Sequence, residues 1–322
     1  MKKAFLLFIL PVLVSTTGKC EDNISVNKVI YSRDNGIREC AGRLSDYVEK
    51  VSGAKFGLAE YDSGKKYNNA FILRLDEALQ IPDSFSIKSD RVNVYLSGNN
   101  TRGLLFAVNE ILEKYYDVRW LTPWDTYIPK KPEVRIEKNI SKTYAPAFAY
   151  RGYHICHSGK DRNGNIVGHY DEKTLAWMSN NKMNMKFVHN DELPEVKNEL
   201  ERLNIMPFPL GGSYNGFCPV SLFGEHPEYF PLINNKRVGQ GVIKRCLSNR
   251  GLQEYFAEQI KRYFKKYPDM TMVSIQPTDG LGWCECKDCL AMDTEDDKKN
   301  KTVNGRVYAF VNIIAEKIHK EY

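Results

Sequence analysis

The sequence predicts an α/β protein in which a small N-terminal α/β domain, residues 23–137, precedes a partial (β/α)8 barrel of the TIM type, residues 144–322. From residue 144 onward, strand-like and helix-like patterns alternate, which is typical of parallel strands joined by helical crossovers. The segments after the predicted strands are long and polar, and those after the helices are short. This asymmetry favours a barrel over a doubly wound open sheet, because a barrel builds its active site from the loops that follow its strands.

The N-terminal domain is predicted to contain two amphipathic helices. Apolar residues at helical spacing indicate a helix over residues 37–51, which Ser52 and Gly53 end. A second helix over residues 102–116 begins after Asn100, a residue type that caps helix N-termini well. Short runs of strand character complete the domain. The predicted strands cover residues 25–31, 71–75 and 92–96.

The barrel domain is predicted to hold four strand–helix units. A closed barrel needs about eight, so we expect about the first half of a barrel. Because the sequence ends inside a predicted helix, we expect a fragment or the product of a truncated gene. The predicted strands cover residues 148–155, 185–189, 205–210 and 270–276, and the predicted helices cover residues 171–181, 193–204, 250–267 and 303–322.

Residues 1–19 are typical of a secretory signal peptide. The positive Met1–Lys3 precedes an apolar run over residues 4–14, and Ser15–Gly18 follows as a cleavage zone. We expect an exported protein in the periplasm, at the cell surface or in the medium. A lipid anchor at Cys20 is an alternative to simple secretion, because a bacterial lipoprotein carries its acylated cysteine at such a position. No later segment is long and apolar enough for a transmembrane helix.

The composition is that of a folded globular protein, with 42% hydrophobic and 27% charged residues. The formal net charge of +6 falls to +3 without the three lysines of residues 1–19. Since there is also no basic stripe or arginine-rich arm, we expect no nucleic-acid partner. Aromatic residues make up 12% of the chain. Most should lie in the core, but exposed rings would suit sugar binding, because an aromatic face packs against the C–H face of a pyranose.

Several segments resemble carbohydrate-active families. Residues 38–55, 100–108 and 118–123 are similar to the N-terminal domain of α-glucuronidases and β-hexosaminidases. Four later segments resemble the DUF4838 family, which overlaps glycoside hydrolase family 163, and the Cys-rich one is the most specific. They are His226–Phe230 (HPEYF), Cys246–Asn249 (CLSN), Ser274–Gly280 (SIQPTDG) and Trp283–Cys289 (WCECKDC). The resemblance implies a glycosidase architecture and endo-β-N-acetylglucosaminidase activity on complex N-glycans, although the second half of the barrel is missing.

Asp279 is the strongest catalytic candidate, and Glu285 is a weaker one. Glycoside hydrolysis usually needs two carboxyl groups, one protonated and one ionised. Asp279 follows the predicted fourth strand, so we expect it at the C-terminal rim of the barrel, where catalytic groups lie. Asp279-Gly280 is also a common turn sequence, which is the alternative interpretation. A second carboxylate is not obvious, and we expect no cofactor to be required for catalysis.

Polar and aromatic residues near the ends of the predicted strands are candidates for sugar binding. Such groups can hold sugar hydroxyls in directed hydrogen bonds, and a tryptophan ring can stack on the sugar. A histidine at a strand end is more often structural. The candidates are Arg151, His154, His157, His189, Asn190, Asp191, Tyr214, Asn215 and Trp283.

Cys284, Cys286 and Cys289 lie within one short segment and are predicted to be structural. With Cys246 or Cys218 as a fourth ligand, they would form a closed structural zinc site. Disulfides among the same cysteines are the alternative in an exported protein.

The leading functional hypothesis is an exported glycoside hydrolase-like protein that acts on an oligosaccharide or glycoprotein glycan containing N-acetylglucosamine. The alternative is a non-catalytic glycan-binding surface protein that lacks the full carboxylate pair. A third hypothesis is a structural surface protein without a ligand.

Overall fold

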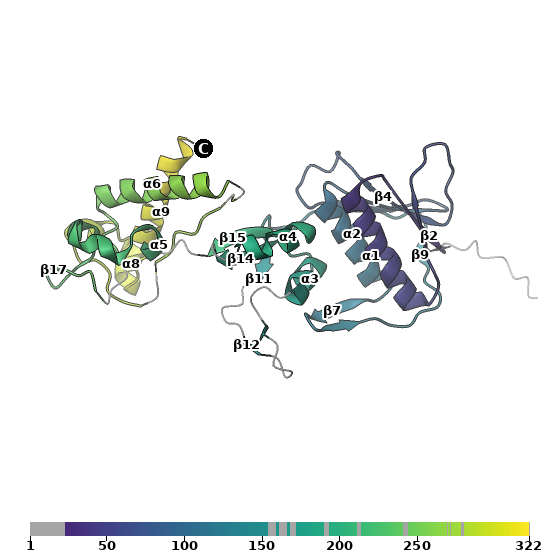
Figure 1. Cartoon of the computed structure of the whole chain (residues 1–322), viewed down its shortest axis with the longest axis horizontal. Helices are drawn as coiled ribbons and strands as arrows, with labels where there is room; N and C mark the ends of the chain where they lie inside the picture. The colour runs from purple at the N-terminus through teal and green to yellow at the C-terminus, as the bar shows by residue number, and fades with distance from the viewer. Residues whose placement is uncertain are drawn as a thin grey trace, which may run out of the picture. The chain divides into compact units, whose positions relative to one another are not determined.

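The structure is a computed structural model that describes residues 23–153, 159–160, 166–167, 172–189, 193–210, 214–240, 244–268, 270, 272–277 and 280–321. The chain divides into two compact units, the first ending at Ala149 and the second beginning at Tyr150 (Figure 1). None of the helices in the described part of the chain combines the length and the apolar character that a bilayer span needs.

Unit 1 is built on a six-stranded sheet with the order β10-β5-β6-β4-β2-β3. β6, β4, β2 and β3 are parallel to one another, β5 pairs antiparallel with β6, and β10 pairs antiparallel with β5. The strands are β2 (Lys28–Tyr31), β3 (Gly57–Glu60), β4 (Ala70–Leu75), β5 (Phe85–Ser89), β6 (Val94–Gly98) and β10 (Ser141–Tyr144). Two small ladders accompany the sheet: β1 (Asn23–Ile24) with β9 (Ile136–Glu137), and β7 (Arg119–Thr122) with β8 (Asp125–Tyr127).

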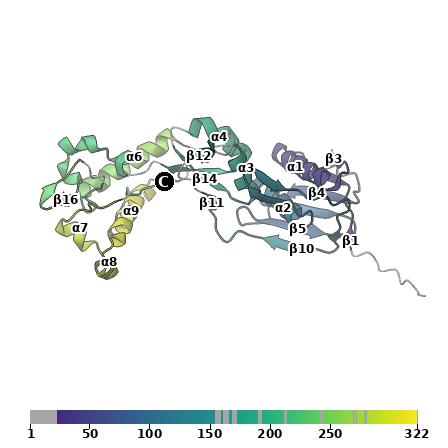
Figure 2. The ribbon, with the colours of Figure 1, turned by 90° about the horizontal axis from the view of Figure 1, so that it is seen from below.

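Two helices, α1 (Asn35–Ser52) and α2 (Thr101–Lys114), pack side by side on the sheet of unit 1 (Figures 1 and 2). The predicted caps are confirmed. The Asn100 side chain accepts a hydrogen bond of 2.7 Å from the Gly103 amide at the start of α2. Gly53 ends α1 with a φ of 78°, in the left-handed region that glycine adopts without steric cost. The sequence thus predicts both helices to within two residues at each end.

The first part of unit 2 is a three-stranded parallel sheet with the order β11-β14-β15. Its strands are β11 (Gly152–Tyr153), β14 (Met185–His189) and β15 (Met206–Leu210), and its crossover helices are α3 (Glu172–Asn180) and α4 (Leu193–Arg202). A small antiparallel ladder of β12 (Gly159–Lys160) and β13 (Ile166–Val167) lies in the chain between β11 and α3. This strand–helix alternation is the predicted one, but the predicted first strand, residues 148–155, is wrong over residues 148–151, which form bends and irregular chain before β11.

The two faces of this sheet carry different contacts, as expected of a barrel wall. Val188 on β14 packs in a buried cluster with Leu175 of α3 and Leu200 of α4. Neighbouring side chains alternate along a strand, so Phe187 lies on the other face. There its ring meets that of Phe208 on β15, with the ring centroids 4.8 Å apart. In a barrel, side chains on the face away from the helices fill the interior.

The prediction of a fourth strand over residues 270–276 is wrong, because the residues described in this range form no strand. Of these, only Gln276 makes a β-bridge, and its carbonyl accepts a hydrogen bond of 3.2 Å from the Tyr214 amide. The apolar character of this run misled the prediction. Val273 and Ile275 pack instead against the aromatic core of unit 2, and that packing requires no strand ladder.

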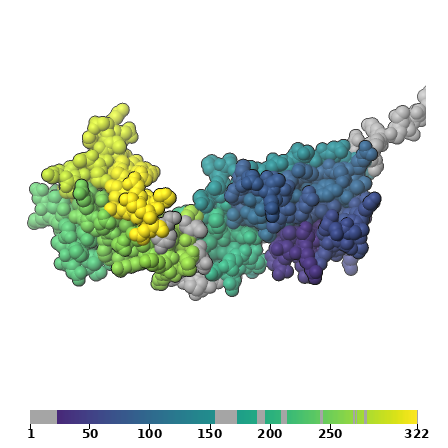
Figure 3. Space-filling view, turned by 90° about the horizontal axis from the view of Figure 1, so that it is seen from above, coloured from purple at the N-terminus to yellow at the C-terminus, as the bar shows by residue number. Residues whose placement is uncertain are grey.

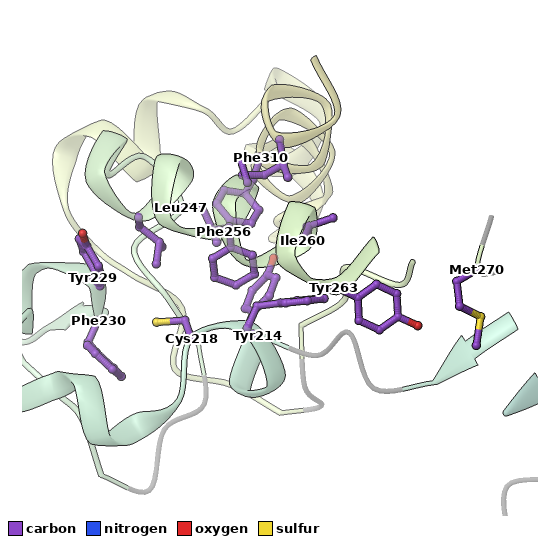
Figure 4. Close-up of a cluster of buried hydrophobic side chains, with 14 residues drawn as sticks. Tyr214, Cys218, Tyr229, Phe230, Leu247, Phe256, Ile260, Tyr263, Met270 and Phe310 are labelled. Atoms are coloured by element: carbon purple, nitrogen blue, oxygen red, sulfur yellow. The ribbon is translucent and has the colours of Figure 1, made fainter. Parts of the chain in front are cut away.

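The aromatic core of unit 2 lies between α5 (Tyr214–Phe217), α6 (Arg250–Lys266) and α9 (Asn304–His319) (Figure 4). Helices α6 and α9 pack against each other (Figures 1 and 3). Phe256 of α6 and Phe310 of α9 meet edge to face, with ring centroids 5.2 Å apart, and Tyr214 contacts both rings. Such edge-to-face pairs contribute about 0.5–1.5 kcal/mol beyond their burial.

Short elements surround this core. They are the 3-10 helices η1 (Val220–Gly224) and η2 (Pro227–Tyr229), the hairpin of β16 (Leu232–Ile233) and β17 (Lys236–Arg237), and the helices α7 (Lys287–Ala291) and α8 (Glu295–Asn300).

Gly98, where β6 meets α2, has no room for a side chain. A Cβ there would overlap the Leu104 amide nitrogen and lie 2.6 Å from the Gly103 carbonyl carbon, and these backbone atoms cannot move aside cheaply. We predict that Gly98→Ala destabilises unit 1 by about 1–3 kcal/mol. Hydrogen exchange of residues 94–114 measures this. Gly42→Ala in α1 is the control, because its Cβ would meet no atom within 4 Å. It should stabilise by up to about 1 kcal/mol, and equal effects of the two substitutions would contradict the prediction.

Candidate functional site

Several of the predicted site residues lie outside the described residues. They are Asp279, His154, His157, Asn190 and Asp191, together with the side chain of His189, whose backbone forms the last position of β14. Their predicted roles in catalysis and sugar binding therefore stay predictions.

Arg151 lies at the N-terminal end of the parallel sheet. It directly precedes β11, and its Nε donates a 2.9 Å hydrogen bond to the carbonyl of Lys182, before β14. Its backbone amide donates to the Asn184 side chain in the same turn. Catalytic groups of barrels lie at the opposite, C-terminal ends of the strands. The structure thus gives Arg151 a role in joining two strand starts, and a sugar contact finds no support in these bonds.

Tyr214 and Asn215 are part of the packing of unit 2. The Tyr214 ring is fully buried in the aromatic core, and its hydroxyl has no hydrogen-bond partner among the described residues. The Asn215 side chain accepts a 2.7 Å hydrogen bond from Arg245, a fully buried arginine whose guanidinium lies 4.5 Å from the Phe230 ring centroid. The contacts described for Tyr214 and Asn215 are therefore structural, and the predicted contacts with sugar find no support in them.

Trp283 follows a protruding loop. Gly280 and Gly282 have φ values of 91° and 92°, in the left-handed region, and Leu281 between them is 92% exposed. The Trp283 ring is half-buried, and the Nζ of Lys244 lies 4.4 Å from its centroid. This is a cation–π contact. Lys244 is itself buried, and Trp283 also packs against the aromatic core of unit 2.

Glu285 is attached to the β16–β17 hairpin. Its carboxylate accepts a 2.8 Å hydrogen bond from the Asn234 amide, and its own amide donates one of 2.8 Å to the Leu232 carbonyl. The side chain remains exposed to solvent. These bonds anchor the Cys-rich segment to the hairpin, which is a sufficient reason for an acidic residue at this position.

The structure brings Cys246, Cys284, Cys286 and Cys289 together, with their sulfur atoms all within 4.8 Å of one another. The Cys246 sulfur lies 3.7 Å from that of Cys286 and 3.8 Å from that of Cys289. Cys218, the other candidate for the fourth position, lies in the aromatic core instead. The described cysteines form no disulfide. This cluster has the residue types and the spacing to hold a metal ion.

Proton sharing among these thiols shifts their pKa values in opposite directions. Hydrogen bonds from Cys284 and Cys289 lower the pKa of Cys246. The same contacts with Cys246 raise the pKa of Cys284 and of Cys289.

Unit 1 contains a hollow of about 370 Å³ over the sheet and the chain that follows β3. Its described lining includes Tyr61, Tyr67 and Tyr95, together with Lys65 and Arg74, and no carboxylate. Without an acid it lacks the groups that glycoside hydrolysis needs.

No sequence signal distinguishes the buried cations Lys244, Arg245 and Arg306 from solvated ones, because lysine and arginine are rarely buried. Arg306 of α9 is only 3% exposed. It donates from Nε and Nη2 to both carboxylate oxygens of Asp293 and from Nη1 to the Cys284 carbonyl at 2.7 Å. Its position three residues after the predicted start of a helix, residues 303–322, does not distinguish it from a solvated residue.

In unit 2, the parallel strands β11, β14 and β15 are joined by α3 and α4 on one face of the sheet. An α/β domain followed by such a unit is the arrangement of a barrel-type α/β protein. Two solved structures of a β-hexosaminidase from Streptomyces plicatus share this fold at 11% identity. The structure with its product GlcNAc has a TM-score of 0.51 and covers 92% of this chain and 60% of that protein. The structure with thio-NAglucal has a TM-score of 0.50 and covers 91% and 59%.

A β-N-acetylhexosaminidase from Bacteroides fragilis matches at 12% identity and a TM-score of 0.48, over 93% of this chain and 61% of that protein. The chain thus spans less than two thirds of the length of these proteins. At such low identity the likeness concerns the fold alone. It confirms the predicted fold class, an N-terminal α/β domain followed by a partial barrel.

The family model described as a domain of unknown function, DUF4838, matches residues 120–322. The chain belongs to the DUF4838 family, as the sequence resemblance predicts. No curated protein matches the chain.

Arg306 should be essential to the stability of unit 2. We predict that Arg306→Met costs about 3–5 kcal/mol of unfolding free energy, because it leaves the Asp293 carboxylate without its partner in a largely buried place. Urea unfolding followed by circular dichroism measures this. Lys317→Met, which breaks the exposed pair of Lys317 and Glu254, is the control and should cost at most about 1 kcal/mol. A loss at Arg306 no larger than that of the control would show that the pair is dispensable.

Proposed function

We propose that the protein is a glycoside hydrolase-like enzyme that acts on glycans containing N-acetylglucosamine, with Asp279 as its acid or substrate-binding carboxylate. Membership of the DUF4838 family and the shared fold with β-hexosaminidases support the proposal. The observation that carries it is the loop that follows Asp279. There the half-buried Trp283 packs against the aromatic core of unit 2, and the Nζ of Lys244 lies 4.4 Å from its ring centroid.

In the proposal the accessible part of Trp283 would stack on the sugar, because an aromatic face packs against the C–H face of a pyranose. Trp283 follows Asp279 by four residues in the sequence, so the proposal assigns both to one site. Glycoside hydrolysis proceeds by acid–base and nucleophilic chemistry of carboxyl groups, so the reaction proposed here requires no resident cofactor. The glycan would be held by the platform and by polar groups at the ends of the parallel strands.

Non-catalytic glycan binding is the second candidate function, and the position of Glu285 favours it. The Glu285 carboxylate is engaged with the Asn234 amide of the hairpin. It is therefore a poor partner for Asp279 as the second catalytic carboxyl group. In this version of the proposal the chain keeps the aromatic platform and binds the glycan without cleaving it.

Cleavage of a complex N-glycan by the full chain, followed by mass spectrometry of the released oligosaccharide, tests the first proposal. We predict that Asp279→Asn reduces the rate at least about a hundredfold, the usual size of an acid–base contribution. Glu285→Gln should retain most of the activity. Equal activity of the Asp279→Asn variant and the unchanged chain would exclude Asp279 from the chemistry.

Titration calorimetry with a chitobiose-type ligand separates the two functions. Binding without cleavage favours the non-catalytic protein, and the absence of both contradicts either function. In both functions Trp283→Ala should weaken binding about fivefold, because stacking contributes about 1 kcal/mol. Trp124→Ala is the control, since Trp124 is half exposed on unit 1.

We also propose that the protein is exported, with residues 1–19 as its signal peptide and the glycan as an extracellular or periplasmic partner. When the full chain is expressed in a bacterium, we predict that its isolated form lacks the leader. Mass spectrometry of the N-terminal peptide measures the cleavage site and any acyl group on Cys20. A retained Met1 in the cell-envelope fraction would contradict the signal peptide, and Cys20→Ala distinguishes lipidation from simple secretion.

A further inference from the structure

The four-cysteine cluster lies on segments far apart in the sequence and has no role in the proposed reaction. Cys246 precedes α6, whereas Cys284, Cys286 and Cys289 surround the start of α7. Three of the four sulfur-bearing side chains are buried, and Cys286 is half-buried. Cys286 also caps α7, with its sulfur accepting a hydrogen bond from the Cys289 amide.

Two of the sulfur–sulfur distances match those of a tetrahedron around one ion, and all four sulfurs lie within 4.8 Å of one another. Zinc–sulfur bonds of about 2.3 Å at tetrahedral angles place neighbouring sulfurs about 3.8 Å apart. The Cys246 sulfur is 3.7 Å from Cys286 and 3.8 Å from Cys289. Two disulfides would bring the sulfurs together in pairs at about 2 Å. The mutual closeness of all four, within 4.8 Å, corresponds to a shared central ligand.

Hydrogen-bond donors surround the sulfurs. The Leu232 amide donates to the Cys284 sulfur at 3.3 Å, and the Cys289 amide donates to the Cys286 sulfur at 3.4 Å. The Ser248 hydroxyl lies 3.2 Å from the Cys289 sulfur and 3.6 Å from that of Cys286. A protonated thiol is a weak acceptor, whereas a metal-bound thiolate is a strong one. These donors therefore fit anionic sulfur.

A divalent ion with four thiolates carries a net charge of about −2, and cations lie close to the cluster. The Nη1 of Arg237 lies 3.9 Å from the Cys284 sulfur. Arg306 donates to the Cys284 carbonyl and fixes the backbone of this ligand. Outer groups of this kind orient metal ligands and adjust their basicity.

We propose that Cys246, Cys284, Cys286 and Cys289 bind one Zn²⁺ in a closed structural site. On binding, the thiols release their protons to solvent and become thiolate ligands. Four sulfur ligands leave no open coordination position, so the ion is not catalytic. Its role is to join residues 244–249 to the Cys-rich segment and, through Leu232, to the β16–β17 hairpin. The ion thereby fixes both Lys244 and Trp283, which flank its ligands in the sequence.

Elemental analysis of the purified full chain tests the site. We expect one zinc per chain, and a loss of at least about nine tenths of it in Cys246→Ser or Cys289→Ser. Cys40→Ser and Cys218→Ser are the matched controls, because these buried thiols lie outside the cluster and should leave the zinc content unchanged. Burial raises the pKa of Cys40 to about 12 and also raises that of Cys218, so both remain protonated.

Three further measurements use chains that keep all four cysteines. Replacement of the ion by Co²⁺ should give the intense visible bands of a tetrahedral tetrathiolate site. Ser248→Ala should keep one zinc but weaken its retention against a chelator about tenfold, as loss of an outer-shell partner does. Zinc removal should increase hydrogen exchange in residues 244–249 and 284–291 and leave unit 1 unchanged.

Three results would each overturn the proposal. The chain could be free of metal after preparation in the presence of zinc, or it could be isolated as a coloured iron protein. Peptide maps without reduction could show a disulfide between Cys246 and a cysteine of the Cys-rich segment. The zinc content is independent of glycan cleavage. A failure of the proposed enzyme function would therefore leave this test intact.

Discussion

The irregular half of unit 2 depends on arginines that satisfy backbone carbonyls. Arg237 donates to the Phe230 carbonyl at 2.6 Å, Arg245 to that of Lys244 at 2.8 Å and Arg306 to that of Cys284 at 2.7 Å. These carbonyls lie in segments with little regular secondary structure, where no strand or helix would pair them. An unpaired buried carbonyl costs about 1–3 kcal/mol. The guanidinium groups therefore donate the hydrogen bonds that these carbonyls would otherwise receive from the backbone of a neighbouring strand.

The aromatic core stabilises unit 2 through apolar packing. Phe256 and Phe310 hold α6 and α9 together, and Tyr214 joins the chain after β15 to both helices. The cysteine cluster lies outside this core, and the proposed ion would cross-link the segments that carry its four cysteines. A packed core and a cross-link from a metal ion are complementary, because the core stabilises helices whereas the ion restricts segments too short to bury much apolar surface.

The proposed sugar platform and the proposed zinc site are physically coupled. Lys244 and Arg245 directly precede the ligand Cys246, and Trp283 directly precedes the ligand Cys284. Anchoring two ligands therefore anchors the cation and the ring of the cation–π pair. A structural ion next to a binding platform would reduce the motion of the platform, and thus the ordering cost of binding a glycan.

Periodicity, capping residues and motifs are local properties of the chain, and they suffice to predict the longer helices, the caps of α1 and α2, the strand–helix alternation and the family. The short helices α5, α7 and α8 and the edge strands β3 and β10 were not predicted. Val273 and Ile275 resembled part of a strand because an apolar run does not show which surface its side chains will meet. Long-range packing places Cys246 rather than Cys218 beside the Cys-rich segment. It also decided that Arg245 and Arg306 are buried and that Tyr214 and Arg151 serve packing and strand joining. These outcomes depend on contacts between residues distant in the sequence, and such contacts are set by the packing of whole elements.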